Sequence, residues 1–298
     1  IVFRKDKTFL LDWMQVYMEA QESAGKKDGS QIKIAMRILK DYAGEMVTLD
    51  QIDGDFCRGY ITYLLTEYHP KGKDISNYTL HNYYRALNGA LNSAVRKKKM
   101  KANPFNELEK SEKIRKPESM RSYMTIEEVQ ALIDTPMPHE EYEIVKCAYL
   151  FSCFCGLRIS DIIKLKWSDV FVDRGQYRLA VSMKKTKEPI YLPLSPEALK
   201  WMPERGGKSS EDNVFDLPSA NTIRMQLKPW AKAAGISKRF SYHTSRHTFA
   251  TMMLTLGADL YTVSKLLGHA DVKMTQVYAK IINKKKDEAV NLVNGLFH

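Results

Sequence analysis

The sequence predicts a mainly α-helical protein with two domains and a small antiparallel β-sheet in the second domain. Three observations support this prediction. A chain of 298 residues suits two domains, apolar residues recur at helical spacing through residues 1–100, and an alternating pattern typical of strands follows Trp167. Because 44% of the residues are apolar and only 15 are glycine, the chain can bury cores, which excludes a disordered or collagen-like protein.

Residues 1–100 are predicted to form a bundle of about four amphipathic helices. Apolar side chains recur three or four residues apart in four stretches, represented by Leu10 and Trp13, Ile32 and Met36, Phe56 and Tyr60, and Leu80 and Tyr84. Turn-forming residues separate the stretches at residues 28–30 and 70–72. The first domain is therefore expected to be helical throughout.

A linker is predicted over residues 101–124, because the helical period is lost there and two prolines, Pro104 and Pro117, lie among charged residues. Thr125 and Glu128 then match a capping box, in which the hydroxyl caps a new helix and the carboxylate reaches back to the backbone. We therefore expect domains over residues 1–100 and 125–298.

The second domain is predicted to mix helices with a β-hairpin. Residues 142–155 are apolar on nearly every side, and they are long enough for a buried helix. Residues 177–183 and 190–194 alternate between apolar and polar side chains, with residues 184–187 at the expected hairpin tip. Helical spacing then returns and continues to the end of the chain.

The charge balance favours a polyanionic partner. Lys and Arg number 46 against 35 Asp and Glu, which gives a formal net charge of +11, and both halves of the chain are basic. A basic run closes the predicted fourth helix and consists of Arg96, Lys97, Lys98, Lys99 and Lys101. Such a run is either a solvated helix end that complements the helix dipole or a set of DNA phosphate contacts, and the sequence leaves both open.

Composition also bears on the compartment and on metal binding. The four cysteines form no even pattern and argue against a disulfide scaffold. Cys147, Cys153 and Cys155 share an apolar stretch without the spacing of zinc ligands, so core packing is expected rather than metal binding. No apolar run reaches the roughly 20 residues that cross a bilayer, and no signal peptide opens the chain. We expect a soluble cytoplasmic protein and, because the sequence begins with Ile1, a fragment of a longer chain.

Two arginines of the second domain are candidates for binding a phosphodiester. Attack on a diester spreads negative charge over the non-bridging oxygens, and an arginine can bind two of them without losing its proton. Arg158 follows the predicted buried helix and precedes Asp161 by three residues, a spacing that places a carboxylate beneath it. Arg246 follows His243 by three residues, so the two share one helix face. An ordinary surface position is the alternative for either arginine.

Tyr278 and Lys185 could supply the other groups that such a reaction needs. A tyrosine hydroxyl can attack phosphorus when its proton is removed, and a lysine in the predicted hairpin tip can protonate a departing 5′-oxygen. A packing tyrosine and a solvated lysine are the ordinary alternatives. His269 precedes Tyr278 by nine residues. His247 directly follows Arg246 and is interpreted as structural, because it faces elsewhere on the same helix.

These motifs occur in the order and approximate spacing of the tyrosine recombinase (phage integrase) family, which the chain resembles. They are Gly156-Leu157-Arg158-Ile159-Ser160-Asp161, Lys185 before Thr186, His243 with Arg246, Leu267-Gly268-His269, and Tyr278. The motifs span residues 120–290, and the helical first domain resembles the family's core-binding domain, which clamps DNA. Within the family, the chain resembles integrases of mobile genetic elements.

The resemblance implies that the second domain binds the scissile phosphate of DNA. Arg158 and Arg246 would clamp that phosphate. His243 and His269 would hydrogen-bond to it or help to move the proton of the tyrosine. Asp161 would position the site without reacting.

The resemblance also implies cutting and rejoining of DNA strands without metal, ATP or any other cofactor. Tyr278 would attack the phosphate and form a 3′-phosphotyrosyl intermediate, while Lys185 would act as general acid on the 5′-oxygen. Because the intermediate keeps the phosphoryl bond, the strand could be joined to a different partner.

A homotetramer on synapsed duplex DNA is a further implication of the resemblance. In such a ring the C-terminal helix docks into a neighbouring subunit. Val290, Val293 and Phe297 recur at helical spacing and fit either that exchange or packing on their own domain. Accessory DNA-bending proteins and location on the bacterial nucleoid are implied as well, and no membrane partner is expected.

Other functions stay open at the level of sequence. A type IB topoisomerase uses similar chemistry to relax supercoiled DNA. A catalytically inactive DNA-binding regulator of the same fold is a second alternative, against which the full set of candidate residues argues. A metal-dependent nuclease or transposase would need clustered carboxylates, and no such cluster stands out in the sequence.

Overall fold

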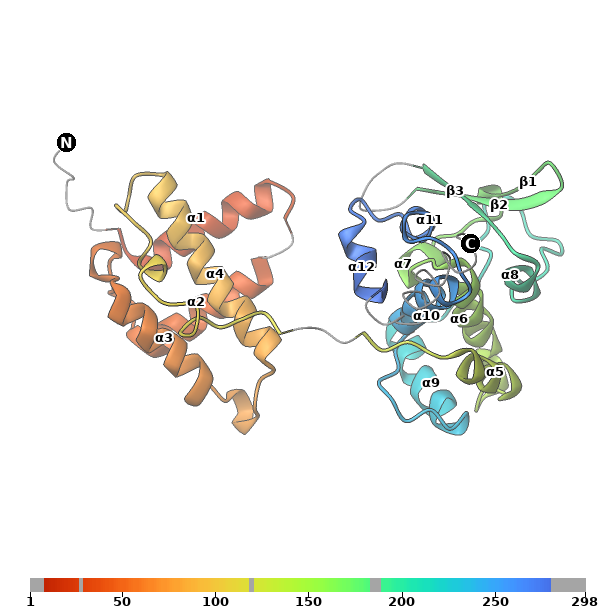
Figure 1. Ribbon diagram of the computed structural model, residues 1–298, viewed down its shortest axis with the longest axis horizontal. Helices are drawn as coiled ribbons and strands as arrows, with labels where there is room; N and C mark the ends of the chain where they lie inside the picture. The colour runs from red at the N-terminus through yellow and green to blue at the C-terminus, as the bar shows by residue number, and fades with distance from the viewer. Residues whose placement is uncertain (1–7, 27–28, 118–120, 183–188, 280–298) are drawn as a thin grey trace, which may run out of the picture. The chain divides into compact units, whose positions relative to one another are not determined.

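The computed structural model describes residues 8–26, 29–117, 121–182 and 189–279. The chain divides into two compact units, residues 1–119 and 120–298 (Figure 1). The fold is mainly helical with a three-stranded antiparallel sheet, so the predicted fold class is confirmed. Within the described ranges, no helix is both long and apolar enough to cross a membrane.

The first unit is built from four helices, as the spacing of apolar residues predicts. They are α1 (Leu10–Ser23), α2 (Gly29–Ala43), α3 (Gly54–Thr66) and α4 (Asn77–Arg96). The side chain of Asp53 caps α3 by accepting from the backbone N–H of Phe56, and Ser76 caps α4 in the same way. The indole of Trp13 on α1 donates to the carbonyl of Ala90 on α4 over 2.8 Å, which ties the two helices together.

Part of the predicted linker is folded into the first unit, so the expected boundaries of 100 and 125 are corrected. Asn103 is 2% exposed and donates to the side-chain oxygens of Asn88 and Asn92 over 2.7 and 2.9 Å. Phe105 and Leu108 lie in the apolar core of this unit. The helical period is absent here because short turns, not a helix, carry these buried residues.

The second unit consists of eight α-helices and three strands within the described residues. The helices are α5 (Ile126–Asp134), α6 (Glu143–Cys155), α7 (Ile159–Ile162), α8 (Pro196–Lys200), α9 (Ala220–Ala233), α10 (Tyr242–Thr255), α11 (Leu260–Leu266) and α12 (Lys273–Ala279). The strands are β1 (Val170–Asp173), β2 (Gln176–Ser182) and β3 (Pro189–Pro193). Thr125 and Glu128 form the predicted capping box at the start of α5.

The sheet has the order β1-β2-β3, with both pairs antiparallel. Val170 pairs with Leu179, and Leu179 pairs in turn with Leu192 on β3, so one register runs across all three strands. The strand pattern predicted over residues 177–183 and 190–194 thus corresponds to β2 and β3. The expected hairpin tip at residues 184–187 lies outside the described residues.

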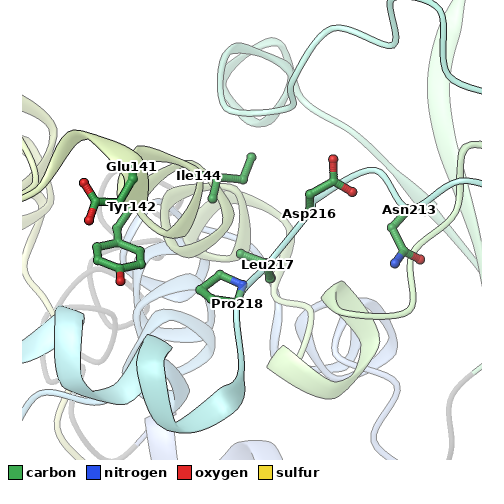
Figure 2. Close-up of a pocket in the computed structure, with 7 residues that line it drawn as sticks. All are labelled: Glu141, Tyr142, Ile144, Asn213, Asp216, Leu217 and Pro218. Carbon is green, nitrogen blue, oxygen red and sulfur yellow. The ribbon is translucent and has the colours of Figure 1, made fainter.

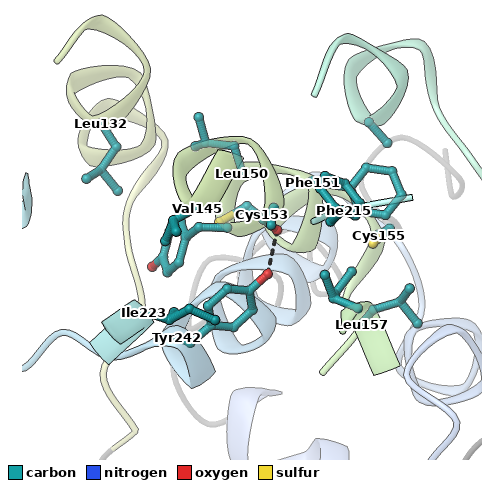
Figure 3. Close-up of a cluster of buried hydrophobic side chains, with 14 of the residues drawn as sticks. Leu132, Val145, Leu150, Phe151, Cys153, Cys155, Leu157, Phe215, Ile223 and Tyr242 are labelled. Carbon is teal, nitrogen blue, oxygen red and sulfur yellow. Dashed lines mark hydrogen bonds between the residues drawn. The ribbon is translucent and has the colours of Figure 1, made fainter. Parts of the chain in front are cut away.

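The core of the second unit surrounds α6, which is buried on nearly every side as its sequence predicts (Figure 3). Tyr149 stacks on Phe240, with ring centroids 4.9 Å apart. The hydroxyl of Tyr242 on α10 donates to the carbonyl of Ala148 over 2.6 Å, which joins α10 to α6. Cys153 and Cys155 are buried in this core as free thiols, in agreement with the expected packing role.

Gly156 ends α6 in a left-handed conformation, with φ of 75°. Its N–H donates to the carbonyl of Ser152, and the chain turns directly into Leu157 and α7. Only a residue without Cβ fits here, because a Cβ would lie 2.6 Å from Cδ1 of Phe249 on α10. This close approach sets α6 against α10.

Replacing Gly156 with Ala is expected to destabilise the second unit by about 2–4 kcal/mol, because backbone strain adds to the overlap with Phe249. Gly175→Ala is the matched control: Gly175 has φ of 78°, but a Cβ added there would meet no atom within 4 Å. It should lose only the strain energy, about 1–2 kcal/mol. Urea unfolding of the full chain, followed by tryptophan fluorescence, measures both. Equal losses would contradict the packing argument.

Candidate active site

Arg246 lies on α10 and is 2% exposed, so the predicted surface alternative does not apply to it. Its Nη1 donates to the carbonyl of Gly156 over 2.7 Å, and its Nη2 donates to the carbonyl of Leu267 over 2.5 Å. Burial, together with the nearby positive charge of Arg158, lowers the pKa of Arg246 to about 10. The guanidinium is thus a buried cation held by neutral carbonyls, an arrangement that favours an anionic ligand.

Arg158 lies at the N-cap of α7 and is partly exposed. Its Nη1 stands 3.9 Å from Oδ2 of Asp161, whose side chain is buried. Ser160 donates to the other carboxylate oxygen of Asp161 over 3.2 Å. The carboxylate predicted beneath Arg158 is therefore present. It lies beyond hydrogen-bond distance, so it balances the charge of Arg158 through space.

Tyr278 lies on α12 and is 1% exposed. Its hydroxyl oxygen is 2.5 Å from Nδ1 of His247. The same oxygen accepts a hydrogen bond from Nη1 of Arg121 over 3.2 Å. The guanidinium of Arg121 also lies 5.7 Å from the centre of the tyrosine ring. The candidate nucleophile is thus held by two side chains that the sequence did not connect with it.

His247 faces a different partner from Arg246, as expected, but that partner is Tyr278, which the sequence did not indicate. One step along a helix rotates a side chain by about 100°, and from Arg246 this step turns His247 towards α12, where it meets Tyr278. Burial lowers the pKa of His247 to about 3, helped by the neighbouring His243 and Arg121. The ring is therefore neutral at pH 7.

His243 and His269 both lie near His247. His243 is exposed, and its ring packs edge-on against His247 with centroids 4.4 Å apart. Loss of hydration and the charge of Arg246 lower the pKa of His243. His269 shares a hydrogen bond of 2.8 Å with the hydroxyl of Thr275, which orients its ring.

The structure brings most of the predicted site residues into one neighbourhood of the second unit. The pKa of His247 is affected by the charges of His243, His269 and Arg246. The pKa of Arg246 is affected in turn by Arg158 and Tyr278. The predicted site residues that lie among the described residues of this neighbourhood are Arg158, Asp161, His243, Arg246, His269 and Tyr278. Lys185 lies outside the described residues.

The predicted DNA-binding run belongs to the first unit. Arg96 ends α4, and Lys97, Lys98, Lys99 and Lys101 follow it, all exposed. Lys98 adopts a left-handed conformation with φ of 58°, which ends the helix. The run is thus available to solvent, as either of its two interpretations requires.

Arg121 is the second residue that the sequence did not reveal. It lies in the stretch predicted as a linker, two residues beyond the boundary between the units, and no motif marks it. Tyr123 and Met124, which follow, are anchored to the second unit, since the N–H of Met124 donates to Thr248 on α10 over 2.9 Å. This anchoring brings Arg121 to α12.

Among the described residues, no three His, Cys, Asp or Glu side chains are grouped as metal ligands. A separate hollow lies beside the start of α6 (Figure 2), and it is lined by Glu141, Tyr142, Ile144, Asn213, Asp216, Leu217 and Pro218. None of the predicted site residues lines it.

Comparison with known proteins agrees with this geometry. Residues 122–285, more than half of the chain, match the phage integrase family, and residues 9–115 match the phage integrase SAM-like domain. The chain belongs to the phage integrase family. The family resemblance read from the motifs is therefore confirmed.

Curated relatives of this integrase-family chain are tyrosine recombinases. One from Pseudothermotoga lettingae is 29% identical over 242 residues, which are 74% of this chain and 82% of the relative. XerD of Halalkalibacterium halodurans is 34% identical over 169 residues, which are 53% of this chain and 56% of XerD. For XerD, the match thus spans little more than half of the relative's length.

Solved structures share the fold at low sequence identity. The Tn1549 transposon integrase in complex with transposon right end DNA has a TM-score of 0.71 and 17% identity, covering 96% of this chain and 99% of that one. The XerH recombinase bound to a palindromic difH substrate has a TM-score of 0.67 and 16% identity, covering 97% and 98%. A lambda integrase dimer bound to a COC' core site has a TM-score of 0.66 and 22% identity, covering 91% and 95%.

The low pKa of His247 predicts a pH dependence of stability. The folded-state pKa of about 3 lies below the ordinary value of 6.5, so between these values the unfolded chain binds a proton that the folded chain does not. The contribution of His247 to stability is fully present above pH 6.5 and is lost as the pH falls towards 3. We expect His247→Gln to weaken this acid-side loss, measured by urea unfolding at about pH 7 and about pH 4.5.

The exposed His139 provides the matched control for this measurement. His139→Gln removes a histidine from the same unit and should leave the dependence unchanged. If His247→Gln retained the whole acid-side loss, the assignment to His247 would be refuted.

Proposed function

We propose that this chain is a site-specific DNA recombinase that integrates or excises DNA by cutting and rejoining strands through a 3′-phosphotyrosyl intermediate. The observation that carries the proposal is the buried guanidinium of Arg246. Arg158 and Tyr278, which lies on α12, are both close enough to affect its pKa. A pair of cations next to a nucleophilic hydroxyl matches the needs of attack on a phosphodiester. Membership of the phage integrase family supports the same chemistry.

In the proposed step, Tyr278 gives its hydroxyl proton to a neighbouring histidine, its oxygen forms a bond to phosphorus, and the bond from phosphorus to the 5′-oxygen breaks. Arg158 and Arg246 hold the non-bridging oxygens and offset the added negative charge. His243 and His269 donate to the same phosphate, and Lys185 gives a proton to the departing 5′-oxygen. The reverse attack by a 5′-hydroxyl of another strand completes recombination.

The fold holds the guanidinium of Arg246 in a fixed orientation before any phosphate binds. Its two bonded donors, Nη1 and Nη2, face backbone carbonyls, which fix the plane of the guanidinium. A guanidinium carries five N–H donors, so beyond these two described contacts it can still donate to an incoming phosphate. Because the plane is fixed by the fold, the phosphate does not bear the entropy cost of ordering the arginine.

Duplex DNA is the proposed partner of both units. The relatives XerH and the Tn1549 integrase were solved with DNA, and the exposed basic run beginning at Arg96 suits phosphate contacts. We further propose a homotetramer on synapsed DNA with exchanged C-terminal helices. Val290, Val293 and Phe297, which would make that exchange, lie outside the described residues.

Tyr278→Phe is expected to abolish the covalent protein–DNA adduct while leaving DNA binding intact, because only the attacking oxygen is lost. The substrate is a pool of nicked duplexes with randomised sequence, and the adduct is read on a denaturing gel. Sequencing the joined DNA from the unsubstituted chain then gives the target site. Tyr261→Phe, at an exposed tyrosine of the same unit, is the control. An undiminished adduct in Tyr278→Phe would exclude Tyr278 as the nucleophile.

DNA affinity is expected to fall steeply with salt, because each neutralised phosphate releases counterions. Changing Lys97 and Lys98 to Gln should reduce the slope of log affinity against log salt by about 0.9 for each lost contact. Fluorescence anisotropy with a labelled duplex measures the slope. Lys40→Gln, at an exposed lysine of α2 that pairs with Glu45, is the control. An unchanged slope would mean that Lys97 and Lys98 are solvated and do not contact DNA phosphates.

A further inference from the structure

The side chain of Arg121 makes two contacts with Tyr278. Its Nη1 donates to the hydroxyl oxygen over 3.2 Å, and its guanidinium lies 5.7 Å from the centre of the ring. The tyrosine is 1% exposed, so water does not compete freely for these contacts. A partly buried cation at the oxygen of a proposed nucleophile is not needed to fill space, since an apolar side chain would do that without desolvating a charge.

The donors and acceptors around the hydroxyl allow one arrangement that satisfies all three partners. Arginine can only donate, so the oxygen of Tyr278 accepts from Arg121. His247 is neutral because burial lowers its pKa to about 3, and its Nδ1 is 2.5 Å from the same oxygen. With Nδ1 as the unprotonated nitrogen of the neutral ring, the tyrosine donates to it while its oxygen accepts from Arg121; the other tautomer would leave the tyrosine O–H without a described partner.

We propose that Arg121 is a positioning residue for the nucleophile Tyr278, which it holds against His247 and stabilises as its oxygen becomes negative. The inference rests on the proposed function of Tyr278. As the proton leaves the hydroxyl, the hydrogen bond from Arg121 becomes charge-assisted on both sides and strengthens. Arg121 would then act on the attacking oxygen, whereas Arg158 and Arg246 act on the phosphate.

The other charged and titratable groups near Tyr278 do not replace Arg121. From α10, His247 contacts the phenol and His243 packs against His247, both with lowered pKa values, while Arg246 directs its two bonded donors to carbonyls. From the segment before α12, His269 bonds to Thr275. Within the described part of the chain, Arg121 is therefore the permanent cation whose donor reaches the hydroxyl.

The decisive experiment compares Arg121→Gln, Arg121→Lys and the unsubstituted full chain. Single-turnover adduct formation is measured on a nicked duplex carrying the site recovered by trapping, across a range of pH. Arg121→Gln should slow the adduct by about 10²-fold, the effect of losing one oriented donor, with DNA affinity unchanged. Its rate should reach half of its plateau at higher pH, because the negative oxygen has lost its cation. Arg121→Lys, which keeps the charge, should restore the pH profile.

Arg239→Gln is the matched control, since Arg239 is an exposed arginine of the same unit. It should leave the rate and the pH profile unchanged. A purely structural role for Arg121 would lower the rate without moving the pH profile and would not be rescued by lysine. That result, or a faster adduct in Arg121→Gln, would overturn the inference.

A second measurement needs no DNA. With 3-fluorotyrosine at position 278 of the full chain, the ¹⁹F resonance reports directly on the phenol. Arg121→Gln should shift or broaden this resonance, while Arg239→Gln should not, and an unmoved resonance would overturn the inference. If the unsubstituted chain forms no adduct, the proposed function fails, whereas the resonance still decides whether Arg121 holds the phenol.

Discussion

The two hydrogen bonds donated by the buried guanidinium of Arg246 are the interaction on which the rest of the second unit depends. The guanidinium donates to the carbonyls of Gly156 and Leu267, which are the C-caps of α6 and α11. Carbonyls at a helix end have no hydrogen-bond partner within the helix. One buried side chain of α10 therefore supplies donors to the ends of two helices. Removing it would leave two buried acceptors unsatisfied, at a cost of about 1–3 kcal/mol each. The cation that the proposed chemistry needs is therefore also required by the fold.

This dual use explains how the other groups are placed. Gly156 lies two residues before Arg158, so fixing its carbonyl also fixes the start of α7. Leu267 lies two residues before His269, whose ring is then oriented by Thr275 on α12. Arg246 thus sets the distance between the first arginine and the segment that leads to the tyrosine. Packing and the proposed chemistry share one set of contacts, which is why the motifs can be far apart in sequence.

The sequence predicted those features that depend on neighbours along the chain. The helix spacing of the first unit, the capping box of Thr125 and the buried helix before Gly156 all arise from local rules, and the structure contains them. It did not predict that Phe105 is buried, because turns carry no period. Arg121 and His247 were missed for a related reason: each acquires its meaning only from Tyr278, which lies 157 and 31 residues away.

The electrostatics of the site are those of a receptor for an anion. Burial and the proximity of other cations lower the pKa of Arg246, His243 and His247 together, so positive charge in this region is destabilised until an anion binds. A phosphate bound there would offset this repulsion and raise all three pKa values. By linkage, phosphate binding and proton uptake then favour each other. His247 would gain basicity when the phosphate arrives, and it is the group to which the hydroxyl of Tyr278 points. Phosphate binding would therefore favour proton transfer from Tyr278 to His247, whose Nδ1 lies 2.5 Å from the hydroxyl oxygen.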